Sequence, residues 1–169
     1  MNFGEKIIND VSTSQRNHSE SLYLAAVQLD DDLHAEAMED GSDPMSVRAA
    51  ISGAVACWAY VTHNHLYVGN VGDSAALLIQ SGPGKSWKGK KMSSIHSGSN
   101  EREVQRINSE HPAAESRTVL RNQRLLGCLS PLRAFGDCRF KLSLAELNTL
   151  EDRNFDFDND GKDKYAVWP

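Results

Sequence analysis

Apolar side chains recur at three- and four-residue steps between residues 20 and 37, and polar side chains fill the positions between them. The apolar positions are Leu22, Ala26, Leu29, Leu33 and Ala37. This spacing places one apolar stripe along a helix and predicts an amphipathic helix. The following segment, Gly41-Ser42-Asp43-Pro44, consists of turn-forming residues and is expected to end that helix.

From residue 52 onward the pattern changes to short apolar and β-branched runs separated by polar turns. The runs predicted to be strands are residues 54–61, 66–71, 75–79 and 87–92. Residues 54–61 carry almost no polar side chains, which indicates a largely buried strand. Because the connections are too short for parallel crossovers, we expect an antiparallel meander.

Helical spacing returns at residues 100–109, where Val104 and Ile107 share one face. Asn100 is a suitable N-cap residue, and Glu103 lies where it would complete a capping box. The pair His111-Pro112 is expected to end this helix. A helix, a series of antiparallel strands and a second helix predict an α+β fold, with helices packed on a sheet.

The length of 169 residues suits one domain or a part of one. We expect a flexible N-terminal segment at residues 1–19, a folded region at residues 20–147 and an acidic loop or tail at residues 148–169. No apolar run approaches the length of a membrane span, so the sequence predicts no transmembrane segment.

The charge of the chain argues against nucleic acid as a partner. The formal net charge is −5, and lysines cluster only within residues 85–91. Such a short cluster cannot replace phosphate counterions along a nucleic acid. We expect it to form a solvated loop or strand edge.

The cysteines and histidines lack the spacing of a metal site. The cysteines are Cys57, Cys128 and Cys138, without a CxxC pair. We expect them to be small buried side chains in a reducing compartment. Ligand spacing on one element is missing among His63, His65, His96 and His111, except for His63 and His65 across a turn. We expect these to be surface residues.

Three segments resemble a known family. Residues 52–57 read SGAVAC, residues 66–74 read LYVGNVGDS, and residues 133–137 read RAFGD. In this order they resemble the motifs of the protein phosphatase 2C family of metal-dependent serine/threonine phosphatases. The resemblance extends over about residues 20–144 and implies part of the family's fold, an antiparallel β-sandwich flanked by helices.

The surrounding residues resemble one branch of this family. They are LDDDL at 29–33, NERE through EHP at 100–112, and RLLGCLSPL at 124–132. These segments are similar to the pyruvate dehydrogenase phosphatases. The resemblance implies a phosphoprotein substrate, the phosphorylated E1 component of pyruvate dehydrogenase, and a mitochondrial matrix location. The first residues show no presequence, since Glu5 and Asp10 do not suit one, and without one a cytoplasmic location is expected.

The family hydrolyses phosphoserine and phosphothreonine with two divalent cations, Mg²⁺ or Mn²⁺, both of which prefer oxygen ligands. The resemblance assigns a metal-binding role to Asp73, because the corresponding aspartate in the family binds an additional cation. Gly72 would let the chain turn so that Asp73 projects from a strand end. Gly72-Asp73-Ser74 is also an ordinary turn sequence, in which the aspartate only caps backbone N–H groups. No residue is assigned as catalytic.

The second motif contributes Arg133, Gly136 and Asp137 beside the site. For Asp137 we expect an architectural role rather than metal binding. It would hold a turn through hydrogen bonds to the backbone and to Arg133.

The departures from the family are extensive. The Asp-Gly-His-Gly motif and the late Asp-Gly and Asp-Asn ligands are absent from the chain. Val55, Ala75 and Ile95 replace the family's threonine, arginine and aspartate. One carboxylate cannot hold two cations, so we expect the chain alone to be inactive, as a fragment of a phosphatase would be. The alternative is a non-catalytic pseudophosphatase or interaction module.

Residues 156–161, DFDNDG, resemble the first half of a calcium-binding loop. The position that should carry a bidentate glutamate is Val167, and an apolar position holds Asp163. We therefore expect an acidic loop here rather than a calcium site.

Overall fold

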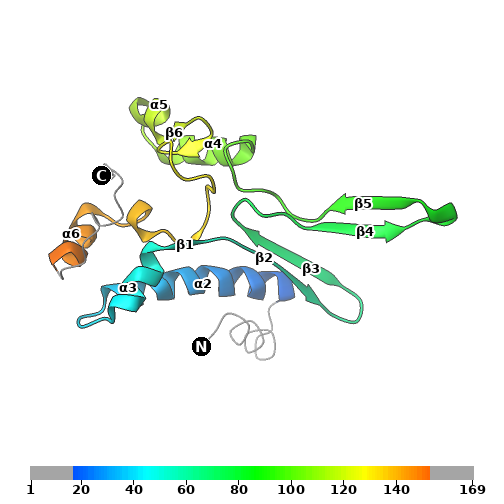
Figure 1. Cartoon of the computed structure of the whole chain (residues 1–169), viewed down its shortest axis with the longest axis horizontal. Helices are drawn as coiled ribbons and strands as arrows, with labels where there is room; N and C mark the ends of the chain where they lie inside the picture. The colour runs from blue at the N-terminus through cyan, green and yellow to red at the C-terminus, as the bar shows by residue number, and fades with distance from the viewer. Residues whose placement is uncertain (1–16, 153–169) are drawn as a thin grey trace. The chain divides into compact units, whose positions relative to one another are not determined.

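The structure is a computed structural model that describes residues 17–152 (Figure 1). These residues form two compact units. The first contains residues 24–54 and 135–152, and the second contains residues 17–23 and 55–134. The calcium-like motif at 156–161 lies outside the described residues.

The predicted first helix is confirmed as α2 (His18–Met38). Its start is fixed by Asn17, whose side-chain oxygen accepts a hydrogen bond from the backbone N–H of Glu20 at 2.9 Å. The helix therefore takes in two residues of the segment that the sequence predicts to be flexible. Leu22, Ala26 and Ala37 of the predicted stripe are buried, whereas Leu29 and Leu33 are half-buried.

A second helix, α3 (Pro44–Ile51), follows at once and is not predicted by the apolar pattern. The segment expected only to end α2 also begins α3. Asp43 caps the backbone N–H of Met45 at 3.2 Å, and Pro44 occupies the first turn, where its missing N–H costs nothing. Val47 and Ala50 are its buried residues.

The first unit contains a short antiparallel pair, β1 (Gly53–Ala54) and β8 (Phe135–Gly136). A 3₁₀ turn, η3 (Cys138–Phe140), leads to helix α6 (Leu144–Asp152). A capping box begins α6, because the Glu146 carboxylate accepts from the Ser143 N–H at 2.8 Å and the Ser143 hydroxyl accepts from the Glu146 N–H at 3.4 Å. Residues 148–152, for which the sequence predicts a loop, therefore complete this helix.

A small hydrophobic core holds the first unit together. Its buried residues are Ala37, Val47, Ala50, Cys138, Leu142, Leu147 and Leu150. Of the three cysteines, Cys138 is buried, as the sequence predicts. The prediction was wrong for Cys57 and Cys128, which are exposed because they lie on a two-stranded hairpin and in a surface turn.

The second unit begins with a hairpin of β2 (Ala56–Val61) and β3 (Leu66–Val71). The predicted turn between them and the predicted strand at 66–71 are confirmed. The prediction of a largely buried strand at 54–61 was wrong, since Val61 is 71% exposed. Residues 53–54 pair instead with β8, and β2 has a ladder partner on only one side within the described residues.

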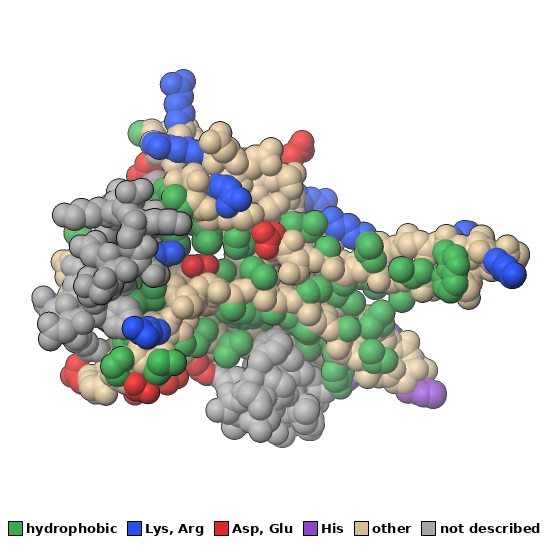
Figure 2. Space-filling view, viewed as in Figure 1, with side chains coloured by type: hydrophobic (Ala, Val, Ile, Leu, Met, Phe, Trp, Pro, Cys, Tyr) green, Lys and Arg blue, Asp and Glu red, His purple; other side chains and the backbone are tan. Residues whose placement is uncertain are grey.

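A second hairpin consists of β4 (Leu77–Ser81) and β5 (Trp87–Lys91), with the 3₁₀ turn η1 (Pro83–Lys85) between them. The predicted meander was wrong, because β3 and β4 do not pair in the described part of the chain. Gly72, with φ of +102°, turns the backbone out of the β3 ladder before β4 begins. Figure 2 shows hydrophobic side chains on the surface of this hairpin, and Leu77, Ile79 and Trp87 are 62–70% exposed.

The predicted second helix is confirmed as α4 (Glu101–Glu110). After it come η2 (Ala113–Glu115), the short helix α5 (Ser116–Val119) and the two-residue strands β6 (Leu120–Arg121) and β7 (Arg124–Leu125). Helices together with antiparallel strand pairs confirm the α+β class. Between residues 17 and 152, no helix is long and apolar enough to cross a membrane.

Candidate functional site

Gly72 is buried at the point where β3 ends, and it allows the turn that the sequence predicts. Its φ of +102° favours glycine. A side chain would not fit, because a Cβ atom would lie 2.1 Å from Cγ1 of Val55 and 3.4 Å from the carbonyl oxygen of Arg133. Val55, which replaces the family's threonine, therefore packs directly against the turn.

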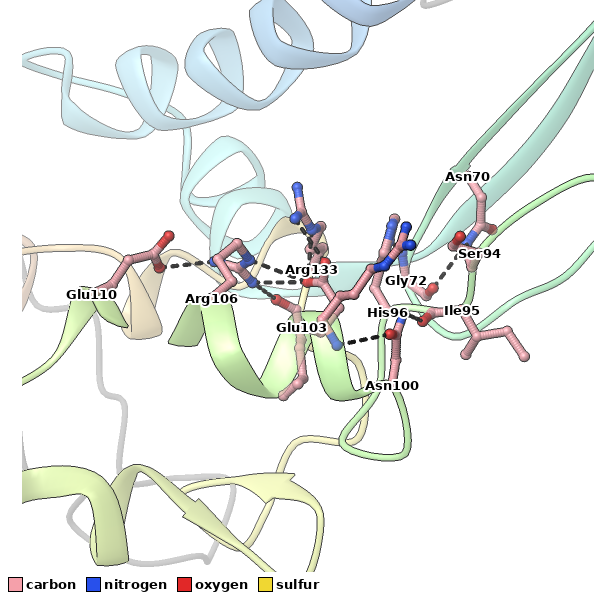
Figure 3. A network of polar contacts seen from close by, with 12 residues as sticks. Asn70, Gly72, Ser94, Ile95, His96, Asn100, Glu103, Arg106, Glu110 and Arg133 are labelled. Atoms are coloured by element: carbon pink, nitrogen blue, oxygen red, sulfur yellow. Dashed lines mark hydrogen bonds and ion pairs between the residues drawn. The ribbon is translucent and has the colours of Figure 1, made fainter. Parts of the chain in front are cut away.

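His96 holds this turn from a distant part of the chain. Its Nδ1 atom accepts a hydrogen bond from the Gly72 N–H at 3.2 Å, and its own backbone N–H donates to the Gly72 carbonyl at 2.9 Å. Asn70 also donates to the Gly72 carbonyl, at 3.0 Å (Figure 3). The expectation that His96 is a surface residue was wrong, because these contacts hold the half-buried imidazole against the turn.

The environment of His96 favours the neutral imidazole. Burial lowers the pKa of His96, and the positive charges of Arg133 and Arg106 lower it further, although Glu103 acts in the opposite direction. A neutral ring with its proton on Nε2 leaves Nδ1 free to accept from Gly72. Protonation of Nδ1 would break that hydrogen bond.

Asp73 projects from the turn and is exposed. One carboxylate oxygen, Oδ2, accepts a hydrogen bond from the Ser130 hydroxyl at 3.0 Å. No backbone N–H donates to the Asp73 carboxylate in the described part of the chain, which argues against a mere capping role. Ser74 follows the turn and is half-buried.

A buried carboxylate on α4 organises the neighbouring part of the unit. Glu103 is 6% exposed, and Arg133 donates to both of its oxygens at 2.8 Å. Arg106 adds two longer contacts to Oε2, at 3.1 and 3.2 Å (Figure 3). The capping box predicted for Glu103 was therefore wrong. Asn100 does cap α4, but its own N–H donates to the Ser97 carbonyl.

The charge state of Glu103 follows from its partners. Burial opposes ionisation, but hydrogen bonds and positive charge from Arg133, followed by those of Arg106, outweigh it and hold the pKa of Glu103 below its usual value. The carboxylate is thus ionised and paired at neutral pH. Such a fork-to-fork pair fixes the direction of both side chains.

The end of the RAFGD motif lies in the first unit. Gly136 pairs with Gly53, and its N–H donates to Asp30 at 2.8 Å. Its φ is +66°, and a Cβ there would lie 2.3 Å from the carbonyl oxygen of Ser52. Glycine is therefore required where these two strands meet.

Asp137 is buried, with 4% of its surface exposed, and its backbone adopts the left-handed conformation with φ of 51°. The hydrogen bond predicted between Asp137 and Arg133 stays a prediction. Within the second unit, both Arg133 groups that donate to a carboxylate donate to Glu103. Within residues 17–152 the Asp137 carboxylate has no hydrogen-bond partner. It lies over Gly53, where a Cβ atom would be 2.0 Å from Oδ2.

The described residues do not fit a complete two-metal centre. No group of three or more histidine, cysteine, aspartate or glutamate side chains is placed to hold a metal ion there. Asp73, an exposed carboxylate with Oδ1 left without a hydrogen bond, suits one oxygen ligand of a hard cation. Alone it supplies a single protein ligand and would hold such an ion only weakly, with water completing the coordination. Ala75 is exposed, and Ile95 is half-buried with its carbonyl bound by Asn100 at 2.8 Å.

Sequence reasoning missed the residues that hold the turn. Nothing in the local pattern joins Ser130 to Asp73, which lie 57 residues apart, or Glu103 to Arg133, which lie 30 apart. A signal for the second pair was present. Glu103 lies four residues before Ile107 on the face of the helix that Val104 and Ile107 share. A carboxylate on an apolar helix face needs a cation, and the motif arginine was available.

Comparison with known proteins supports the family. The model of the protein phosphatase 2C family matches residues 1–151. This match contains the stretch of about residues 20–144 over which the motifs resemble the family, and it extends beyond that stretch on both sides.

Similar curated proteins carry related names. Mitochondrial pyruvate dehydrogenase (acetyl-transferring) phosphatase 1 of Homo sapiens is 41% identical over 150 residues, which are 85% of this chain and 26% of the relative. Phosphatase 2 of the same species is 36% identical over 140 residues, covering 80% and 26%. The Saccharomyces cerevisiae phosphatase 1 is 35% identical over 134 residues, covering 75% and 23%.

The chain thus spans about a quarter of the length of the curated relatives it matches. The ordered motifs, the buried glycine turn before Asp73 and the family match over residues 1–151 lead to one conclusion: the chain belongs to the protein phosphatase 2C family.

Proposed function

We propose that the chain is a central part of a protein serine/threonine phosphatase domain, which hydrolyses phosphoserine or phosphothreonine on a protein substrate. The observation that carries this proposal is the Gly72 turn. The turn admits only glycine, is bonded to His96 from both sides, and presents the exposed carboxylate of Asp73. A motif kept only as an ordinary turn would not need these contacts.

Asp73 is the residue that would bind a divalent cation, Mg²⁺ or Mn²⁺, through a carboxylate oxygen. Bound cations of this kind lower the pKa of a water molecule and offset the charge of the phosphoryl group. The chain's own contribution is positional. Gly72 sets the direction of Asp73, and the Ser130 hydroxyl occupies its Oδ2 atom.

The chain alone should be inactive. The described residues supply one suitably placed carboxylate, and a two-metal reaction needs several. Activity therefore requires the ligands that the family places in other segments.

For the substrate, we propose the phosphorylated E1 component of pyruvate dehydrogenase, dephosphorylated on serine in the mitochondrial matrix. This proposal is supported by the names of the similar proteins, which are mitochondrial pyruvate dehydrogenase phosphatases, at 36–41% identity. The segments at 100–112 and 124–132, which resemble that branch, support it from the sequence.

A non-catalytic interaction module is the second candidate. It is favoured by the exposed apolar side chains of the β4–β5 hairpin, Leu77, Ile79 and Trp87, and by the loss of the family's arginine and aspartate at Ala75 and Ile95. A pseudophosphatase would keep the Gly72 turn for its architecture alone. It would then tolerate the loss of the Asp73 carboxylate.

A segment exchange tests the proposal. Residues 1–151 replace the matching segment of human pyruvate dehydrogenase phosphatase 1, and Mg²⁺-dependent phosphate release from a phosphoserine peptide is measured. The proposed function predicts activity in the exchanged enzyme and none in the chain alone. A folded exchanged enzyme without activity would support the interaction module. Metal-dependent activity of the chain alone would refute the claim that the chain has too few metal ligands for the reaction.

A further inference from the structure

Residues 130–133 form a short strap that joins the two parts of the candidate site. At one end the Ser130 hydroxyl donates to Asp73 at 3.0 Å. At the other end Arg133 donates to both oxygens of Glu103 at 2.8 Å. Between them, Pro131 forms an isolated antiparallel bridge with Ser97. The strap therefore has a fixed contact at each end and one in its middle.

Helix α4 holds the strap at two successive residues. Besides the pair between Glu103 and Arg133, the guanidinium of Arg106 donates to the Leu132 carbonyl at 2.9 Å while it contacts Glu103 (Figure 3). Arg106 is itself held by Glu110, at 2.8 Å. The Glu103 carboxylate thus binds both Arg133, which belongs to the strap, and Arg106, which donates to the strap.

A second route leads from the same strap to the same turn. The Leu132 N–H donates to the His96 carbonyl at 2.8 Å, and His96 in turn exchanges two hydrogen bonds with Gly72. The strap is therefore connected to the turn in two ways. Leu132 is linked through His96 to the backbone of Gly72, and Ser130 binds the carboxylate of Asp73.

We propose that Ser130 and Glu103 are positioning residues for the Asp73 carboxylate. This inference rests on the proposed function, because it gives Asp73 its role. Ser130 acts directly by holding Oδ2, which leaves Oδ1 free for a ligand. Glu103 acts through Arg133 and Arg106, which fix the place of the strap and hence of the Ser130 hydroxyl.

The physical reason is the exposure of Asp73. An exposed aspartate side chain samples several rotamers, and a ligand must then select one of them. A single hydrogen bond to a fixed partner restricts that choice before any ligand binds. Removal of the hydroxyl should therefore weaken cation binding without changing the fold.

The test uses nuclear magnetic resonance on the whole chain, with two readouts. The first is the side-chain rotamer of Asp73 without metal, from its χ1 couplings. The second is the concentration of Mn²⁺ that broadens the amide signals of residues 72–74. For Ser130→Ala we expect averaged couplings and about three- to tenfold more Mn²⁺ for the same broadening, the worth of one hydrogen bond. Ser130→Thr, which keeps the hydroxyl, should restore both.

Matched control variants show whether an effect comes from Ser130 and Glu103 themselves or from the loss of any nearby hydroxyl or carboxylate. Ser99→Ala removes a hydroxyl that contacts only Ser97 in the described structure, and should change neither readout. Glu103→Gln should average the Asp73 couplings, whereas Glu101→Gln, on the exposed face of the same helix, should not. If Glu103→Gln unfolds the chain, the two Ser130 variants decide the proposal.

The outcomes distinguish this inference from the proposed function. Unchanged couplings and an unchanged Mn²⁺ requirement in Ser130→Ala would overturn the positioning role, while Mn²⁺ broadening lost in Asp73→Asn would still support the metal role. Averaged couplings in Ser130→Ala, without Mn²⁺ broadening in the native chain, would support positioning and contradict the metal role.

Discussion

The imidazole Nδ1 of His96 accepts a hydrogen bond from the backbone N–H of Gly72 at 3.2 Å, across 24 residues of sequence. The contact requires a ring that is unprotonated at Nδ1. Burial and the charges of Arg133 and Arg106 lower the pKa of His96 and favour that state. The turn that carries Asp73 is thus linked to the protonation of one histidine.

The chain should accordingly lose stability in mild acid. The pKa of His96 is lower in the folded chain than the value of about 6.5 in the unfolded chain, so the unfolded chain binds more protons below that pH. Its contribution to stability is therefore present above pH ~6.5 and is lost as the pH falls below it. Urea unfolding at a series of pH values should show this slope. His96→Gln should flatten it, and His63→Asn, in an exposed turn, should not; equal slopes in all three would refute the assignment to His96.

Replacement of Glu103 should be costly. Glu103→Gln leaves Arg133 and Arg106 without their shared carboxylate, and we expect a loss of about 2 kcal/mol in the free energy of unfolding, since hydrogen bonds between charged groups carry that much. The partial exposure of Arg133 keeps the figure below that of a fully buried pair. Glu101→Gln is the matched control and should cost under about 0.5 kcal/mol. Equal losses in both variants would show that the pair is not structural.

Gly72 should not tolerate alanine. Gly72→Ala introduces a Cβ atom 2.1 Å from Val55 at a φ of +102°, and we expect a loss of about 2–3 kcal/mol from overpacking and backbone strain. Gly84 also has a positive φ, of 68°, but nothing lies within 4 Å of the position that a Cβ atom would take there. Gly84→Ala should thus cost about 1 kcal/mol, from strain alone. Thermal unfolding of both variants, with Val55→Ala added to the first, separates the clash from the strain.

Asp137 should act against stability at neutral pH. Burial raises the pKa of Asp137, an effect to which Asp30 adds although Arg139 and Lys141 oppose it. The folded chain therefore holds its proton more tightly than the unfolded chain, whose aspartates titrate near pH ~3.9. Stability from this residue is present below that pH and is lost as the pH rises through the folded value.

Asp137→Asn removes the charge and keeps the shape. In urea unfolding, the variant should be more stable than the native chain at neutral pH, and the difference should disappear at a pH below the unfolded value of about 3.9. Asp31→Asn, on the exposed face of α2, is the control. A variant that is less stable at neutral pH would show that the ionised carboxylate has a favourable partner.

Local patterns predicted the elements whose signals lie within a few residues. The apolar stripe of α2, the run of β3 and the Asn100 cap of α4 are of this kind, and so is the glycine turn before Asp73. Helices α3 and α6 were missed because each is short and depends on a cap, Asp43 or Ser143. Asp43 also lies in a segment that is typical of a turn, and part of α6 falls in the predicted loop from residue 148.

The remaining features depend on partners far apart in the chain. Gly53 pairs with Gly136, Asp30 binds Gly136 across 106 residues, and Glu103 pairs with Arg133 rather than capping its own helix. No periodicity encodes such pairs. The two hydrogen bonds between His96 and Gly72 could be found only once the backbone placed these residues together.

The Mg²⁺ dependence of the enzyme carrying residues 1–151 tests the central claim most directly. Phosphate release from a phosphoserine peptide is measured over a range of Mg²⁺ concentrations, for the native segment, for Asp73→Asn and for the exposed control Asp31→Asn. We predict that Asp73→Asn requires at least about tenfold more Mg²⁺, as loss of a charged ligand implies, while Asp31→Asn matches the native segment. An unchanged Mg²⁺ requirement in Asp73→Asn would contradict the account.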